Sequence, residues 1–325
     1  MDHPALVNLL ARLPALTLLV VGDYFLDRYL EIDPSLAETS LETGLEVHQV
    51  VRVRNAPGAA GTVTSNLRAL GVNVIALGVI GDDGDGYELK RALAATGVDI
   101  APLVESRERF TPTYTKPLRE GRELNRIDIK NRVPLPGSIE DAVIARLRHL
   151  APRVSGIIVV DQVQEANCGV VTDSVRAEIA ALASGQIVVA ESRERIGLFR
   201  GVIVQANTRE ARRATGLDAI GECGAELLRR NSCPALITIG AEGVRVFDAA
   251  GSAHIPAVPV RGPIDTVGAG DSVIAGFAAA LCAGANPREA AEVGNLVAAV
   301  TIQQIGTTGT ATPEQVLAAQ RGIEK

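Results

Sequence analysis

The sequence predicts an α/β fold: a doubly wound, mostly parallel sheet flanked by helices, with a small β-strand lid. Continuous Val/Ile/Leu runs of strand length suit strands that are buried on both faces of a parallel sheet. The segments between them have helical spacing and end at Gly, as helices often do. This alternation indicates a doubly wound sheet. The strand-like runs are residues 16–22, 74–81, 156–161, 186–192, 201–207 and 235–240, and the helical segments include 61–71, 86–97 and 172–185.

The chain is expected to begin with a short helix, followed by a buried first strand. Its apolar N-terminal run is interrupted by Arg12 and Pro14, and Asp23 ends it far short of a bilayer span. We therefore expect no membrane partner. The four cysteines lie far apart without a C-x-x-C pair, which indicates reduced thiols in a cytoplasmic protein.

Two stretches depart from the helix and strand alternation, residues 28–54 and 109–130. Polar and apolar residues alternate in both, which predicts half-exposed antiparallel strands. We expect them to form a lid over the substrate and to contact the same element of a second subunit in a homodimer. Because no repeat or composition break divides the chain, residues 1–325 are expected to form a single domain.

Composition argues against several functions. The formal net charge is −6 and no block of five Lys/Arg occurs, so nucleic acid is not an expected partner. The four histidines have neither metal-ligand spacing nor a nearby nucleophile motif, so neither a zinc site nor a Ser-His-Asp triad is expected. A G-x-G-x-x-G motif after the first strand would suggest a nucleotide-dependent oxidoreductase, but the chain has "GDYFLD" there.

Acidic and polar residues follow the predicted strands. In an open parallel sheet, ligands bind beyond the carboxyl ends of the strands. This edge is therefore expected to bind a polar substrate and magnesium-bound phosphates. The residues that follow strands are Asp23, Asp27, Asp82, Asp83, Asp161, Glu191, Asn207, Glu210, Gly240 and Gly243.

The stretch "IDTVGAGDSVIAGF", residues 264–277, predicts an anion site. A helix that begins at about Ala269 leaves its first N–H groups unpaired and carries partial positive charge there. Gly268 and Gly270 let the backbone approach a phosphoryl group, which the N–H groups of Ala269, Gly270 and Asp271 can surround. The Asp271 carboxylate can accept a proton from an attacking hydroxyl group.

The pattern D-T-x-G-A-G-D-S at residues 265–272, followed by a helix of small residues, resembles the ribokinase-like (PfkB) carbohydrate kinases. The resemblance covers nearly the entire chain and implies an ATP-dependent kinase that phosphorylates a hydroxyl of a sugar or sugar phosphate. It implies that Asp271 is the general base and that Gly268, Ala269 and Gly270 form the anion hole. The resemblance also implies Mg²⁺ and a monovalent cation such as K⁺.

The same resemblance implies further site residues. For the substrate these are Asp27, Gly58, Ala59 and Thr62, to which the strand-end rule adds Asp161; for the nucleotide they are Asn207, Glu210, Thr238, Gly240, Gly243 and Asn295. Asn207 and Glu210 would order Mg²⁺ through water, whereas Asp265 and Gly306 would hold the monovalent cation. The glycine-rich substrate segment departs from the family pattern at Pro57 and Thr62, where Gly and Asn are usual.

Within the family, residues 20–32, 112–128 and 294–316 look most similar to the kinase part of bacterial heptose-7-phosphate kinases, which makes heptose phosphate a candidate substrate. The basic cluster Lys116, Arg119, Arg122 and Arg126 would bind a substrate phosphate or form a solvated strand edge. Arg193 would reach ATP phosphates or pair with a neighbouring glutamate. A nucleoside kinase and a catalytically silent sugar or nucleotide sensor of the same fold stay open as alternatives.

Overall fold

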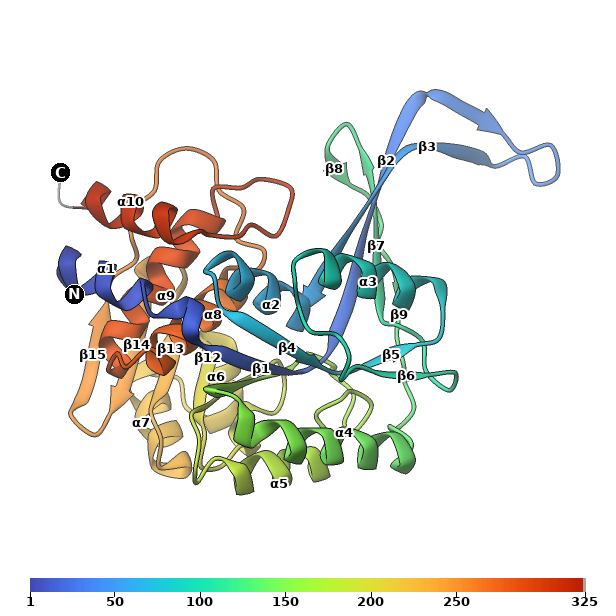
Figure 1. Ribbon diagram of the computed structural model, residues 1–325. Coiled ribbons are helices and arrows are strands. Elements are labelled where there is room, and N and C mark those ends of the chain that lie inside the picture. The colour runs from blue at the N-terminus through green and yellow to red at the C-terminus, as the bar shows by residue number, and fades with distance from the viewer. Residues whose placement is uncertain (324–325) are drawn as a thin grey trace.

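A large twisted sheet forms the centre of the molecule (Figure 1). The structure is a computed structural model that describes residues 1–323. The sheet is parallel from β13 to β4, and β14 and β15 extend it antiparallel at one edge. The predicted doubly wound fold is confirmed. In spatial order the strands are β15 (Gly251–Ile255), β14 (Val244–Asp248), β13 (Ala235–Thr238), β12 (Ile203–Asn207), β11 (Val188–Ser192), β10 (Gly156–Asp161), β1 (Thr17–Gly22) and β4 (Asn73–Leu77).

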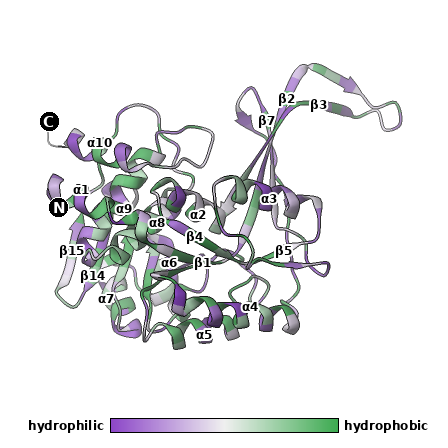
Figure 2. Cartoon of the chain, in the orientation of Figure 1, coloured by the Kyte–Doolittle hydropathy of each residue, from purple (hydrophilic) through white to green (hydrophobic). Residues whose placement is uncertain are grey.

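Helices cover both faces of this sheet, and each face has its own apolar layer. Hydrophobic residues concentrate where the helices meet the strands (Figure 2). One layer contains α1 (His3–Leu10), α2 (Ala60–Ala69), α3 (Gly84–Ala95), α8 (Ala269–Cys282), α9 (Pro287–Thr301) and α10 (Pro313–Ile323); the other contains α4 (Gly137–Leu150), α5 (Asp173–Leu182), α6 (Thr208–Thr215) and α7 (Ile220–Asn231). Short 3₁₀ turns are η1 (Leu13–Ala15), η2 (Ala151–Arg153), η3 (Ile196–Leu198) and η4 (Gly240–Glu242).

One expected strand is divided in two. The apolar run 74–81 forms β4 and then, after Gly78, the separate strand β5 (Val79–Gly81), which pairs with β6 (Val104–Ser106). A Cβ atom at Gly78 would lie 2.6 Å from the ring of Tyr24 and 2.8 Å from the carbonyl oxygen of Gly22. The chain therefore bends away from the large sheet at a close backbone approach that only glycine allows.

A second sheet projects from this body, and most of its residues come from 28–54 and 109–130 (Figure 1). The long β2–β3 ribbon extends furthest and exposes several valines and leucines. The strands were expected to be antiparallel throughout, which is wrong for one pair, because β2 and β7 run parallel. The antiparallel β3 returns the chain to the starting end of β2, and after α2, β4 and α3 the chain enters β7 at this same end. The strands are β2 (Tyr24–Thr39), β3 (Glu46–Ala59), β7 (Thr113–Arg119), β8 (Arg122–Glu123) and β9 (Ile127–Ile129).

No helix within residues 1–323 is both long enough and apolar enough to cross a membrane. The four cysteines are free thiols. The expected homodimer and cytoplasmic location stay predictions.

Helices α8 and α9 pack unusually closely, and this contact positions the start of α8. A Cβ atom on Gly276 would lie 2.8 Å from Val297 Cγ2 and 3.1 Å from Gly294 Cα, and one on Gly294 would lie 2.8 Å from the carbonyl oxygen of Val273. The two glycines thus let the helix backbones approach each other.

We predict that Gly276→Val lowers the free energy of unfolding by about 1–3 kcal/mol, because the added methyl groups overpack this contact. Chemical denaturation would measure it. Gly221→Val is the matched control, since a Cβ atom at this α7 glycine meets only Arg245 Nη1 at 3.8 Å. Equal stability of the two variants would contradict the prediction.

Candidate functional site

The candidate active site is a cavity of about 550 Å³ at the carboxyl ends of the central strands, between the large sheet and the second sheet. Its walls come from β2, α2, β7, β11, β12, α6, β13 and α8. The structure thereby brings together most of the expected site residues, which lie far apart in the sequence. Those that line the cavity are Asp27, Ala59, Thr62, Lys116, Arg126, Asn207, Glu210, Thr238, Gly268, Ala269, Gly270 and Asp271.

Helix α8 begins in this cavity. Its N-cap residue Gly268 has a φ of 79°, a left-handed conformation that favours glycine. The N–H of Ala269 donates to the carbonyl of Thr266 at 3.2 Å, whereas within residues 1–323 no acceptor faces the N–H groups of Gly270 and Asp271. Gln205 donates to the carbonyl oxygen of Gly270 at 2.9 Å and holds this first turn in place. The geometry leaves two backbone donors for an anion.

Asp271 stands in the first turn of α8, where it is half-buried in the wall of the cavity. Burial raises the pKa of its carboxyl group to about 7, and the charges of Asp27 and Glu210 act in the same direction. The positive charge of Arg193 opposes them. Burial also raises the pKa of the neighbouring Glu191 well above its ordinary value, with the Asp271 charge as the second cause. Asp271 is therefore a carboxyl group whose proton exchanges near neutral pH.

Asn207 and Glu210 form a capping box at the start of α6. Asn207 Oδ1 accepts from the N–H of Glu210 at 2.9 Å, and Glu210 Oε2 accepts from the N–H of Asn207 at 2.8 Å. Burial raises the pKa of Glu210. Within the described residues, no three acidic, His or Cys side chains are grouped to hold a metal ion. These two residues fit a hydrated magnesium ion that is shared with nucleotide phosphates, rather than a metal held by the protein alone.

Asp27 lies at the opposite side of the cavity, on β2, and is paired with a lysine from β7. Lys116 Nζ lies 3.1 Å from Asp27 Oδ1 and 3.3 Å from the Tyr29 hydroxyl, and both charged side chains are about one-tenth exposed. Burial is the largest influence on Lys116 and opposes its charge, but the charges of Asp27 and Tyr29 and the hydrogen bonds to both together outweigh it and raise the lysine pKa. The pair fixes the orientation of a carboxylate that faces the cavity.

The substrate segment before α2 is held close to Asp27. A Cβ atom on Gly58 would lie 2.8 Å from Asp27 Oδ2, so this glycine lets the backbone pass beside the carboxylate. Ala59 adopts a φ of 54° and a ψ of −118°, a conformation that L-residues rarely adopt. Ala59 and the buried Thr62 line the cavity, where their methyl groups reduce its polarity.

Asp161 is not among the residues that line the cavity, and its expected contact with the substrate stays a prediction. Its buried carboxylate is bound by Arg195, with Nη2 to Oδ1 at 2.6 Å, and by the Ser192 hydroxyl at 2.6 Å. Arg195 also donates to the carbonyl of Gln164 at 2.9 Å. Asp161 therefore holds the loops after β10 and β11 together.

Three expected nucleotide residues also lie outside the cavity walls. Asn295 is buried and donates to the carbonyl groups of Ile255 and Pro256, at 3.1 and 3.0 Å. Gly240 and Gly243 form the turn after β13, where a Cβ atom on Gly243 would lie 2.3 Å from the carbonyl oxygen of Ile255. Their positions beside a nucleotide stay predictions.

The two residues expected at the monovalent cation site do meet. Asp265 Oδ2 accepts from the N–H of Gly306 at 3.1 Å, and Oδ1 accepts from the N–H of Val267 at 3.1 Å. The carboxylate thus links the chain before α8 to the loop after α9. Cation binding there stays a prediction.

The basic cluster expected on the lid is divided between two surfaces, so the expectation of one four-residue cluster is wrong. Lys116 and Arg126 line the cavity. Arg119 instead binds Glu46 at 2.9 Å, and Arg122 lies opposite it in the β7–β8 pair. Successive side chains alternate across a strand, which separates Lys116 from Arg119. Arg126 lies over the Tyr114 ring at 4.3 Å and makes two hydrogen bonds to Asp128, at 2.7 and 3.0 Å.

Glu191, inside β11, and Arg193, just after it, both line the cavity, at the sheet edge where the sequence had placed them. Sequence reasoning missed other cavity residues. Gln205 lies inside β12, where an apolar strand pattern gives no signal for it. Tyr114 and Gln162 contribute from β7 and from the loop after β10. Only the packing of these elements places their side chains in one cavity.

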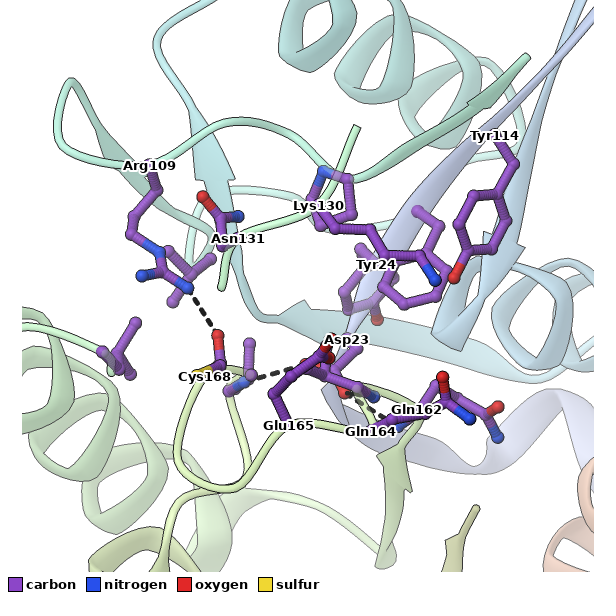
Figure 3. Close-up of a pocket in the computed structure, with 17 residues that line it drawn as sticks. Asp23, Tyr24, Arg109, Tyr114, Lys130, Asn131, Gln162, Gln164, Glu165 and Cys168 are labelled. Carbon is purple, nitrogen blue, oxygen red and sulfur yellow. Dashed lines mark hydrogen bonds between the residues drawn. The ribbon is translucent and has the colours of Figure 1, made fainter. Parts of the chain in front are cut away.

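A second cavity of about 30 Å³ adjoins the first and shares Tyr114, Gln162 and Gln164 with it (Figure 3). Asp23 accepts from the N–H groups of Gln162, Val163 and Val170 at 2.8, 3.0 and 2.8 Å. Arg109 donates to the carbonyl of Cys168 across the same space (Figure 3). This volume holds one or two water molecules, so the cavity is part of the joint between the two sheets rather than a site for a larger ligand.

The sequence of the chain is similar to a family of carbohydrate kinases and to bacterial proteins of known name. The chain matches the family described as pfkB family carbohydrate kinase over residues 22–133 and 201–315. It is 33% identical over 332 residues to the bifunctional protein HldE of Trichlorobacter lovleyi, and 30% identical over 328 residues to that of Geobacter sulfurreducens. Each alignment covers 98% of this chain, which spans 66% and 65% of the two relatives.

Solved structures show the same fold. The structure of Arabidopsis thaliana ribokinase complexed with ribose and ATP aligns with a TM-score of 0.70 at 18% identity, covering 94% of this chain and 98% of that one. The nucleoside kinase of Methanocaldococcus jannaschii aligns with a TM-score of 0.66 at 21% identity, covering 94% and 98%.

Proposed function

The chain belongs to the pfkB family of carbohydrate kinases, and we propose that it transfers the γ-phosphoryl group of ATP to a hydroxyl group of a sugar or sugar phosphate. One observation carries this proposal: the N–H groups at the start of α8, which have no acceptor within residues 1–323, and the half-buried carboxyl group of Asp271 belong to one turn and face one cavity. An anion-binding group and a proton acceptor are the two functions that phosphoryl transfer to an alcohol requires.

The proposed reaction places the acceptor between Asp271 and Asp27. Asp27, held by Lys116, orients the sugar hydroxyl groups. The ionised Asp271 takes the proton of the attacking hydroxyl group as its oxygen bonds to phosphorus, and the bond to the bridging oxygen of ADP breaks. The N–H groups of Gly270 and Asp271 stabilise the charge on the transferred group.

Asn207 and Glu210 would order a magnesium ion through water, and this ion neutralises charge on the nucleotide phosphates when it is bound. Asp265 and the backbone at Gly306 would hold a monovalent cation next to the start of α8.

A phosphorylated heptose is the acceptor that we favour. The likeness to HldE proteins supports this choice, and so do the cations Lys116 and Arg126, which line the cavity. A coupled ADP assay over pentoses, hexoses, heptose phosphates and nucleosides tests the proposal. ADP formation with a nucleoside alone would identify a nucleoside kinase instead. Nucleotide binding without ADP formation from any acceptor would identify a sensor.

We predict that Asp271→Asn lowers kcat by roughly 10²- to 10⁴-fold, the usual contribution of a positioned proton acceptor. The affinity for ADP should stay within about twofold of the wild-type value, since the amide keeps the size of the side chain. Steady-state kinetics and calorimetry would measure the two quantities. Turnover close to that of the wild type would exclude Asp271 as the base.

The rate should depend on the ionisation of Asp271. Below its pKa of about 7 the carboxyl group holds a proton and cannot accept another. We therefore expect kcat/KM to fall about tenfold for each pH unit below 7 and to level off above it. The same linkage predicts that the free energy of unfolding falls as pH rises from the ordinary value of 3.8 to about 7, because only the folded protein retains the proton in that range.

A pH–rate profile and denaturation at several pH values measure these effects. Asp271→Asn is the control in the denaturation series. Because its side chain does not ionise, the free energy of unfolding of this variant should fall less steeply between pH 4 and pH 7 than that of the wild type. A wild-type kcat/KM that is flat or falls between pH 5 and pH 8 would contradict the assignment.

The KM for a phosphorylated acceptor should depend on Arg126. Its guanidinium group lines the cavity beside Tyr114, and a charge-assisted hydrogen bond contributes about 1.5–3 kcal/mol. We predict that Arg126→Gln raises KM for the phosphorylated acceptor roughly 10- to 100-fold and leaves KM for ATP unchanged. Arg122→Gln on the exposed β8 is the control. An unchanged acceptor KM in Arg126→Gln, or a preference for an unphosphorylated sugar, would refute the sugar-phosphate choice.

A further inference from the structure

Arg193 lies directly after β11, and its backbone is fixed on both sides. Its N–H donates to the carbonyl of Asp161 at 3.0 Å, and its own carbonyl accepts from Arg213 at 3.4 Å. The side chain lines the cavity, in company with Glu191 and the first turn of α8. A rigid strand end therefore carries an exposed guanidinium group into the candidate active site.

The glutamates that the sequence offers as partners for Arg193 are engaged elsewhere. Glu191 accepts from Gln162 Nε2 at 3.0 Å. Glu194 forms an ion pair with Arg213. Within residues 1–323, no carboxylate lies within 4.0 Å of the Arg193 guanidinium group, so the expected surface ion pair does not form.

The other cations that line the cavity differ from Arg193. Lys116 is bound to Asp27, and Arg126 is bound to Asp128. Arg209, in the first turn of α6, has no carboxylate partner in the described part of the chain, but its charge reaches mainly the adjacent Glu210. The charge of Arg193 acts on more groups than the charge of Arg209 does. Burial is the largest influence on the pKa values of Asp271, Glu191 and Glu210, and the charge of Arg193 opposes it in all three.

These groups belong to α8, β11 and α6, and the Arg193 charge also acts on Tyr114 of β7. Arg193 lines the same cavity as all four of these groups. Four carboxyl groups, those of Asp27, Glu191, Glu210 and Asp271, line the cavity together with four cations, and two of these cations, Lys116 and Arg126, are paired with carboxylates. ATP would add further negative charge at the same place. Arg193 has no carboxylate partner in the described part of the chain, so its positive charge is available to act on a phosphate together with the anion hole.

We propose that Arg193 is a further catalytic residue, whose guanidinium group binds the γ-phosphoryl group of the nucleotide on the side opposite the start of α8. This inference rests on the proposed kinase function. The planar array of N–H donors on the Arg193 guanidinium group can donate hydrogen bonds to two phosphoryl oxygens at once. As the acceptor oxygen bonds to phosphorus and the bond to ADP breaks, the acceptor proton passes to Asp271 and Arg193 stays charged throughout. It stabilises the charge on the transferred group.

Binding of two magnesium nucleotides tests the proposal without any acceptor. In calorimetry, Arg193→Gln should bind the non-hydrolysable triphosphate AMPPNP at least about tenfold more weakly than the wild type does, because a charge-assisted contact is lost. Its affinity for ADP, which lacks the γ-phosphoryl group, should change less than about twofold. Arg193→Lys should recover part of the lost affinity, since it keeps the charge without the fork. Arg153→Gln, in η2, is the control for a general loss of positive charge.

With an acceptor identified by the ADP assay, Arg193→Gln should lower kcat by roughly 10²- to 10³-fold, as removal of a transition-state donor does. Equal weakening of AMPPNP and ADP, or no weakening of either, would overturn the proposal, as would an unchanged kcat. If no acceptor is phosphorylated, the kinase function fails, but the AMPPNP comparison still decides the role of Arg193. If Arg193→Gln does not fold, as judged by its thermal unfolding, Arg193→Lys supplies the same comparison.

Discussion

The start of α8 is the feature on which the candidate site depends. A helix N-terminus that faces a cavity leaves N–H groups without acceptors and concentrates partial positive charge there. Here two such groups, at Gly270 and Asp271, stand next to a carboxyl group that burial keeps partly protonated near neutral pH. The protein alone stabilises neither the two N–H groups nor the ionised carboxyl group well. An incoming phosphoryl group would satisfy the backbone donors, and an attacking hydroxyl group would use the carboxylate.

The rest of the body holds this unfavourable arrangement in place. Gly276 and Gly294 let α8 and α9 pack at close range, and the Thr301 hydroxyl donates to that of Ser272 at 2.9 Å between them. Such close packing resists relaxation. Other polar groups at the same sheet edge serve the scaffold: Asp23 and Asp161 hold loops through several hydrogen bonds each. Some carboxylates at this edge of the sheet thus hold the loops in place, whereas others face the cavity.

The second sheet supplies the other wall of the cavity. Asp27 and Lys116 come from neighbouring strands, β2 and β7, and their ion pair spans the parallel contact between these strands. The antiparallel pairing of β7 with β9 places Tyr114 beside Arg126. The sheet is joined to the body near Arg109 and Asp23, next to the small second cavity (Figure 3). A change in the angle of this joint would alter the distance between Asp27 and Asp271, and with it the space for an acceptor.

The sequence by itself determined the doubly wound sheet, the helix that begins at Ala269 and the chemistry of its first turn, because these depend on local periodicity and on residues adjacent in the chain. It also pointed to Asn207 and Glu210, whose capping box is formed within four residues. Tertiary structure alone decided which charges are free. Asp161 is paired with Arg195, whereas Arg193 has no carboxylate partner within residues 1–323, because Glu191 and Glu194 are bound by side chains from other elements. Ion pairs form between residues distant in sequence, so strand periodicity and spacing carry no information about them.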